Sequence, residues 1–274
     1  MKSKNMSKIL MDNILYICLL LMIVIIAIIS PSFISVRVLS DVLTQSAPKM
    51  LLAVGMLVVI IAGGMDMTVG RLAGLGAVVS GTLAQQSTYY IKFWPSLPEM
   101  PLIVPIVVSI IIGIISGVFT GLIISKLKVP AFLAGLGLQL IIYGGNLLFM
   151  KKAPNNSQPL AGFKESFTKF GTGSVAGVNY LIIVAFVVMI AVYIILNMTT
   201  LGKNIYATGG NREAAKVAGI NVFKIDMFVY ILSGALAALA GCMLAARTVG
   251  AIATYAEGYV KDASASCIIG GVSF

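Results

Sequence analysis

Long apolar stretches alternate with short polar segments along most of this sequence. A helix of about 20 apolar residues is long enough to cross the hydrocarbon core of a bilayer. Only 10% of the residues are charged, whereas an average soluble domain has about a quarter. We therefore expect an all-α integral membrane protein, a polytopic helix bundle that forms one domain over residues 1–274. The expected spans lie near residues 14–30, 50–64, 67–86, 102–125, 130–150, 180–198 and 227–246, with a partial span at 262–274.

The positive charges indicate how the spans are oriented. Lys and Arg resist translocation, so basic connections favour the cytoplasmic side. Three lysines precede the first apolar stretch, which is long for a signal peptide and is not followed by a small-x-small cleavage site. We expect a cytoplasmic N-terminus, with the basic turn at 126–129 and the basic segment at 201–224 also inside. The connections at 32–48, 87–101, 151–179 and 248–261 then lie outside, although 151–179 is itself basic.

Composition also limits the possible chemistry. The net charge of +10 could suggest a nucleic-acid partner, but basic cytoplasmic loops that face anionic membrane lipid explain it, so we expect no nucleic acid. The sequence has no histidine, the commonest general base and metal ligand, and its three scattered cysteines do not form a disulfide framework. We expect no catalytic residue and no metal site. Gly271, Val272 and Ser273 could begin a protease elbow, but histidine is missing to activate the serine.

The polar segment 201–224 contains a predicted short helix. Asn211 can cap its start, Glu213 falls in its first turn, where the helix dipole favours an acid, and Gly219 can close it. One interpretation is an ordinary solvated loop that fixes the topology. The other is a docking helix that receives force from a cytoplasmic partner. The charge pattern alone slightly favours the first.

A carboxylate, Asp66, lies inside a glycine-rich apolar region. The glycines permit a break in the helix, and Asp66 and Thr68 could cap the helix where it restarts. A carboxylate at membrane depth normally faces a partner or a water-filled path. Asp66 could therefore pair with Arg71 and hold the bundle together, or the broken helix could line the substrate path or its gate. The two interpretations are compatible.

Gln139, Tyr143 and Asn146 recur at helical spacing, so they are expected on one face of the span at 130–150. These side chains hydrogen-bond without carrying charge, as binding of a neutral sugar requires. Polar contacts between helices are the alternative use.

Small residues recur at four-residue spacing in two spans and predict close helix packing in the membrane. The two sets are Gly113, Gly117 and Gly121, and Ser233, Ala237 and Gly241.

Two motifs resemble a known transporter family. Glu213-Ala214-Ala215, followed by Gly219, looks like the EAA-type loop of permease subunits in ATP-binding-cassette importers. GGNREAAKVAGINV, at 209–222, and AGGMDMTVGRLAGLGAVVS, at 62–80, are similar to the sugar-importing branch that includes the ribose and galactose/methylgalactoside permeases. The similarity runs from near Met11 to the last residue. It implies an ATPase-coupling loop that contains Gly209, Gly210, Asn211, Glu213, Ala214, Ala215 and Gly219.

The resemblance implies a permease subunit in the bacterial inner membrane that imports a monosaccharide, galactose/methylgalactoside-like or ribose-like, by alternating access. No Gly-x-x-x-x-Gly-Lys-(Ser/Thr) motif occurs, so ATP would be bound by a separate cytoplasmic ATPase subunit. The other implied partners are a second permease copy and a periplasmic or lipid-anchored sugar-binding protein. The candidates for the substrate path are Asp66, Thr68, Gln139, Tyr143 and Asn146.

Two alternatives accompany this interpretation. An ion-coupled secondary sugar transporter normally needs several acids within the membrane, and only Asp66 and Asp262 qualify. Members of the family also continue beyond the final GGVSF with further helices. We therefore expect a C-terminally truncated chain, with an inverted repeat whose second half is incomplete.

Overall fold

The computed structural model describes residues 14–152 and 154–272. The chain separates into two units, residues 1–43 and 44–274, which we describe individually. The first unit contains α2 (Ile14–Ile29), the short 3-10 helix η1 (Pro31–Phe33) and the first turns of α3 (Val36–Ile61). α2 is apolar throughout, as the prediction of a first membrane helix requires.

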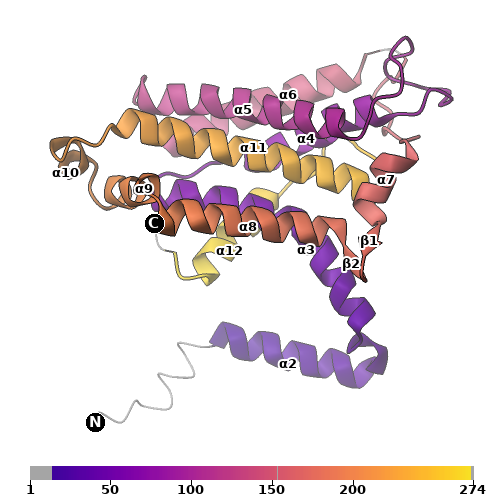
Figure 1. The fold of residues 1–274 in the computed structure, drawn as a ribbon, viewed down its shortest axis with the longest axis horizontal. Helices are drawn as coiled ribbons and strands as arrows, with labels where there is room; N and C mark the ends of the chain where they lie inside the picture. The colour runs from indigo at the N-terminus through magenta and orange to yellow at the C-terminus, as the bar shows by residue number, and fades with distance from the viewer. Residues whose placement is uncertain (1–13, 153, 273–274) are drawn as a thin grey trace. The chain divides into compact units, whose positions relative to one another are not determined.

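The second unit is almost entirely helical (Figure 1). After α3 come α4 (Val69–Ala84), α5 (Ile103–Ser125), α6 (Ala131–Met150), α7 (Glu165–Thr172), β1 (Ser174–Val175), β2 (Val178–Asn179), α8 (Tyr180–Met198), α9 (Thr200–Gly210), α10 (Arg212–Val217), α11 (Val222–Thr248) and α12 (Tyr259–Ile269). Within the described residues, α3, α5, α6, α8 and α11 are long and apolar enough to cross a membrane, and α4 is a shorter apolar helix. The expected all-α polytopic fold is confirmed.

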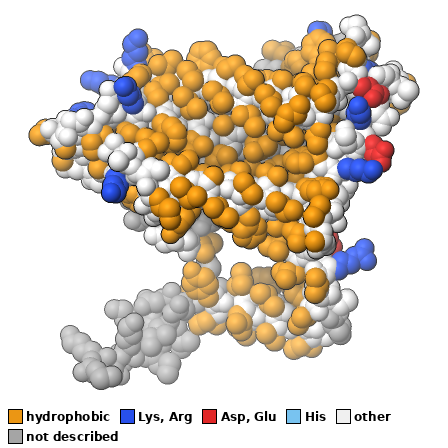
Figure 2. Space-filling view, in the orientation of Figure 1, with side chains coloured by type: hydrophobic (Ala, Val, Ile, Leu, Met, Phe, Trp, Pro, Cys, Tyr) orange, Lys and Arg blue, Asp and Glu red, His pale blue; other side chains and the backbone are white. Residues whose placement is uncertain are grey.

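Helix α11 is the most buried long helix and packs along α4 and α5. Small residues permit this contact, because helices in lipid associate by close packing of their backbones. A Cβ added at Gly117 of α5 would lie 2.4 Å from the backbone oxygen of Tyr230, and one at Gly241 of α11 would lie 1.8 Å from that of Ala73. Both small-residue faces predicted from the sequence are thus at helix contacts. Figure 2 shows hydrophobic side chains over the middle of the visible face of this unit and charged ones toward its ends.

Three connections meet at the end of the second unit that carries α7. Gln85 pairs with Phe163 in one β-bridge, and Leu160 exchanges two backbone hydrogen bonds of 2.8 and 3.0 Å with Ala251 in another. The segments 87–101 and 151–179, both expected outside, therefore lie at one end. α10 lies at the other (Figure 1).

One helix boundary differs from the expected span. The second span was expected near 50–64, after an external segment at 32–48, and α3 begins at Val36 and contains Pro48 in its interior. Proline removes one backbone donor, yet membrane helices tolerate it when neighbouring groups satisfy the freed carbonyl. Pro48 is buried, and the helix continues through it as one element of 26 residues.

A second difference concerns residues 249–258, expected to form part of an external loop. This non-helical segment runs along the glycine face of α4. A Cβ at Gly81 would contact Ala251, one at Gly74 would lie 2.7 Å from the Tyr255 oxygen, and one at Gly70 would lie 2.9 Å from the Ala256 oxygen. The segment thus follows α4 from Gly70 to Gly81, about 17 Å at 1.5 Å per residue. Irregular backbone at this depth is tolerated where it packs against protein or lines a cavity.

Candidate functional site

The segment 201–224 forms two helices, α9 and α10, where the sequence predicted one. The predicted cap of α10 is present. Asn211 Oδ1 accepts hydrogen bonds from the backbone N–H groups of Glu213 and Ala214, at 3.0 and 2.9 Å. Gly219 has a φ of +85°, in the left-handed region that glycine adopts without strain, and it follows the last turn. The local sequence therefore determines both ends of this six-residue helix.

A buried carboxylate ties α10 to the bundle. Arg212 donates to both oxygens of Asp226 on α11, whose side chain is only 6% exposed. Ser125, the last residue of α5, donates to the same carboxylate at 2.9 Å. Ala215 is buried as well, so α10 is held on one side by packing and by a charged hydrogen bond. The sequence predicts an apolar stretch that starts at Met227, which leaves Asp226 outside it; an acid one residue before that stretch was the available signal.

The outer side of α10 is bare. Val217 is 91% exposed, and Glu213 lies beside it with a side chain that is 80% exposed. Lys216 donates to Glu213 at 2.6 Å, and this hydrogen bond holds the pKa of the Glu213 carboxyl below its ordinary value. An exposed apolar residue framed by charges at the end of a helix bundle is suited to contact with another protein. Ala214 and Gly219 share this exposure.

Helix α9 connects α10 to the end of α3. A Cβ at Gly209 would lie 1.8 Å from the backbone oxygen of Ile61, the last residue of α3, so only glycine fits at that contact. At Gly210 nothing lies within 4 Å. α9 thus contacts the end of α3, just before the interruption, through Gly209.

The interruption between α3 and α4 is closed by Asp66, which is 2% exposed. Its Oδ1 accepts from the Thr68 N–H at 2.9 Å and the Thr68 hydroxyl at 2.6 Å, and its Oδ2 accepts from the Ser233 hydroxyl at 2.8 Å. Thr68 occupies the N-cap position of α4, but its side chain makes no capping hydrogen bond.

The predicted pair between Asp66 and Arg71 is wrong. Arg71 bonds instead to Glu257, at 3.1 Å. The reason is that Asp66 faces α11, whereas Arg71 lies against α6: its guanidinium stacks on the ring of Tyr143, 4.0 Å from the centroid.

The three polar residues of α6 do share one face, toward α4 and the segment 249–258. Gln139 lines a cavity together with Arg71 and Glu257. Tyr143 stacks on Arg71, and Asn146 donates to the backbone oxygen of Ala253 at 3.3 Å. The five candidate path residues thus form two groups, because Asp66 and Thr68 face the contact with α11 instead.

A family model described as "Branched-chain amino acid transport system / permease component" matches residues 38–274. The chain belongs to this permease family. It is 36% identical over 264 residues to the galactose/methyl galactoside import permease protein MglC of Escherichia coli (strain K12), which covers 95% of this chain and 78% of that protein. The MglC protein of Haemophilus influenzae is 36% identical over 99% of this chain and 82% of its own length.

The ribose import permease protein RbsC of Escherichia coli (strain K12) is 34% identical to the permease described here, over 96% of this chain and 78% of that protein. No solved structure matches the chain. The resemblance to sugar permeases of ATP-binding-cassette importers is therefore confirmed, and together with its apolar helices it makes the permease a multi-pass protein of the inner membrane.

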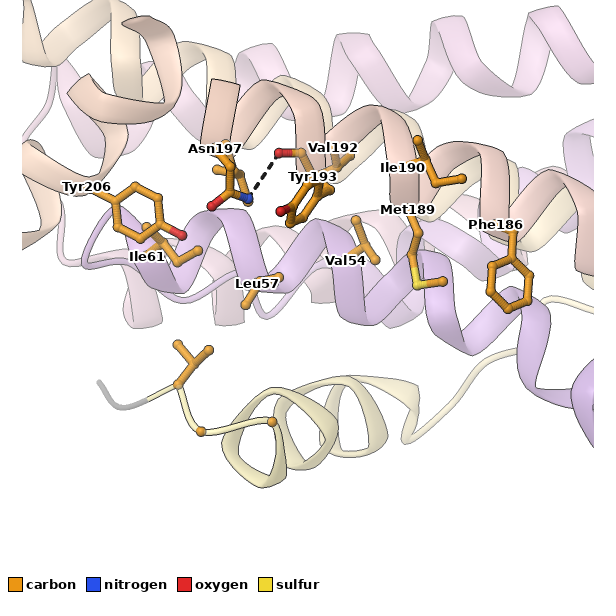
Figure 3. Close-up of a pocket in the computed structure, with 14 residues that line it drawn as sticks. Val54, Leu57, Ile61, Phe186, Met189, Ile190, Val192, Tyr193, Asn197 and Tyr206 are labelled. Carbon is orange, nitrogen blue, oxygen red and sulfur yellow. Dashed lines mark hydrogen bonds between the residues drawn. The ribbon is translucent and has the colours of Figure 1, made fainter. Parts of the chain in front are cut away.

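An apolar groove lies away from the candidate path residues (Figure 3). It has a volume of about 810 Å³ between α3, α8 and α9, with residues 270–272 on one side. Its lining is apolar apart from the polar tips of Tyr193, Asn197 and Tyr206, and Asn197 donates to the Tyr193 backbone oxygen at 3.0 Å. It contains none of the candidate path residues. Within the described ranges, no three His, Cys, Asp or Glu side chains are grouped as metal ligands would be.

Proposed function

We propose that the permease imports a monosaccharide, galactose-like or ribose-like, driven by a separate ATPase subunit that docks on α10. The substrate class rests on the sugars that the relatives are named for. The docking role rests on one observation: α10 is bare on its outer side, where Val217 is 91% exposed, and is held on its inner side by Asp226. A helix that is both accessible and firmly attached can transmit force.

The contacts suggest how force would reach the membrane interior. Movement of α10 would pull on α11 and α5 through Asp226 and would press α9 against Ile61 through Gly209. Both routes end beside the interruption at 62–68. Such displacement would bias the permease between inward-open and outward-open states, with ATP bound and hydrolysed on the partner. In this scheme two permease copies form the path, an external sugar-binding protein delivers the substrate, and the N-terminus is cytoplasmic.

The test reverses the charge at the proposed dock. Glu213→Lys should abolish sugar uptake and reduce co-purification of the ATPase, because the charge at the proposed dock is reversed and the bond to Lys216 is lost. Glu165→Lys is the matched control: Glu165 forms a similar exposed pair, with Lys169 at 2.7 Å, but at the opposite end of the bundle. Normal uptake and normal ATPase binding in Glu213→Lys would refute the docking role.

The contacts of Asp66 and Asp262 do not favour the alternative function, an ion-coupled secondary sugar transporter. Both oxygens of Asp66 accept hydrogen bonds inside the protein, and Asp262 forms an exposed pair with Lys49 at 2.7 Å.

A further inference from the structure

Two interrupted helices meet at a polar cavity that the proposed function does not use. Helix α4 restarts at Val69 after the interruption at 62–68, and α12 starts at Tyr259 after the segment 249–258. The starts are in contact, since a Cβ at Gly70 would lie 3.4 Å from the backbone nitrogen of Val260 in the first turn of α12. Between them and α6 lies a cavity of about 270 Å³. Asp66 reaches Ser233, near the middle of α11, so the start of α4 lies at about mid-length of the bundle, whereas Glu257, Gly258 and Lys261 at the start of α12 are exposed.

The cavity contains an arginine with unused hydrogen-bonding capacity. One guanidinium nitrogen of Arg71, Nη2, donates to Glu257, while Nη1 is buried and lacks a partner. Among the described residues, only one other buried side-chain atom shares this condition, Oδ1 of Asn146 on the same polar face. A buried donor without a partner costs roughly 1–3 kcal/mol, so such groups are normally satisfied by water or a ligand.

The rest of the lining is mixed in its hydrogen-bonding character. Gln139 offers an amide that both donates and accepts, Glu257 offers a carboxylate, and Lys261 offers an ammonium group. Tyr143 stacks on Arg71 and fixes the guanidinium plane. Neither helix start has a side-chain cap, at Thr68 or at Gly258, although at the second start the Tyr259 and Lys261 N–H groups donate to the Ala256 and Gly258 oxygens. A ligand with many hydroxyl groups, each both donor and acceptor, matches this set.

We propose that this cavity binds the monosaccharide during its passage, with Arg71, Gln139 and Glu257 as its hydrogen-bonding partners. The site rests on the proposed function for its substrate class. Discontinuous helices whose starts converge near the middle of a bundle form substrate sites in many transporters, because the starts carry partial positive charge and unpaired donors. Glu257, which is 63% exposed, can exchange its bond to Arg71 for a sugar hydroxyl as the ligand enters.

The first experiment asks whether sugar occupies the cavity. Gln139→Cys is placed in a background in which Cys18, Cys242 and Cys267 are replaced by alanine. The assembled permease with its ATPase is treated in lipid nanodiscs with a positively charged methanethiosulfonate, with and without galactose or ribose. We expect labelling of the cysteine, slowed about threefold or more by the transported sugar. Tyr90→Cys is the control, because Tyr90 is 84% exposed in the 85–101 connection and should react equally under both conditions.

The outcomes separate the two proposals. A background protein that binds the ATPase but takes up neither sugar overturns the proposed function and this site with it. A background protein that takes up sugar, while the cysteine at 139 is either unreactive or unprotected, overturns the site alone.

A second measurement excludes a purely structural role. Glu257→Gln should raise the KM for uptake by about tenfold, since loss of a charged hydrogen bond to the ligand weakens binding by roughly that factor. ATPase co-purification should be unchanged. Glu99→Gln is matched to it, because Glu99 forms a comparable pair with Lys164, at 3.4 Å, outside the cavity. An unchanged KM in Glu257→Gln, or an equal rise in both variants, contradicts the proposal.

Discussion

The chain interrupts its helices at two places within the bundle, and the two interruptions are satisfied in different ways. At 62–68, Asp66 is buried and both of its oxygens accept hydrogen bonds from protein groups. At 249–258, Glu257 is largely exposed, and the arginine it contacts keeps one nitrogen unpaired. The carboxylate at the first interruption is therefore satisfied without a ligand, whereas the ion pair at the second leaves an arginine nitrogen without a hydrogen bond. A helix interruption whose polar groups are all paired has a structural role, whereas an interruption with an unpaired polar group can bind a ligand.

The largest expected effect tests that difference directly. Asp66→Ala removes three hydrogen bonds and leaves the Thr68 and Ser233 hydroxyls buried, so it should destabilise the permease by about 2–4 kcal/mol. Glu257→Ala breaks one partly exposed pair and should cost about 1 kcal/mol or less. Denaturant titration of the purified permease in detergent measures both. An equal loss of unfolding free energy in Asp66→Ala and Glu257→Ala would contradict the proposed difference in hydrogen bonding between the two interruptions.

A smaller effect on stability is expected at the contact between Gly209 of α9 and Ile61, at the end of α3. Gly209→Ala places a Cβ where the Ile61 oxygen lies, 1.8 Å away, so α9 must move from the end of α3. Overpacking of this kind typically costs about 1–3 kcal/mol. We expect reduced sugar uptake with the ATPase still bound. Gly210→Ala is the control, because a Cβ at Gly210 has no atom within 4 Å, and its uptake should match that of the parent. Similar uptake in the two variants would contradict a role for α9 in transmitting movement to α3.

The smallest expected effect lies at the surface of α10, away from both interruptions. The bond from Lys216 lowers the pKa of Glu213 from its ordinary value of 4.5, so the charge of Glu213 is fully present above that value and is lost only as the pH falls through the lowered pKa. Titration of Glu213 should therefore not change the affinity for the ATPase between about pH 5.5 and 8. Titration of binding in the parent and in Glu213→Gln tests this. A change in ATPase affinity over that pH range that occurs in the parent but not in Glu213→Gln would contradict this prediction.

Much of the fold follows from local sequence. The apolar stretches behind α5, α6 and α8 end at charged or polar residues within one or two positions of the predicted limits. The cap at Asn211 and the glycine at 219 were predictable because capping depends on neighbours only a few residues away. Packing stripes such as Gly113 and Gly117 were also visible, because one helix face repeats at a fixed interval.

Long-range pairing was not predictable. Arg71 lies five residues from Asp66 yet pairs with Glu257, because the orientation of α4 decides which neighbour each side chain meets. Nothing in the local pattern of 249–258 shows that it runs along α4, since long-range contacts decide where a non-helical segment packs. Asp226 was missed for a related reason: its partner, Arg212, belongs to a helix that folds back on it.

The two β-bridges beside α7 fix the position of the segment 249–258 along α4. Phe163 is fixed to Gln85, at the end of α4, and Leu160 is fixed to Ala251, at the start of the segment that carries Glu257. The chain length from 160 to 163 therefore sets how far that segment slides along α4. Surface connections usually tolerate added residues, but one residue inserted here would shift the carboxylate away from the guanidinium by about 3 Å. An insertion a few positions earlier, around 156, leaves the spacing intact.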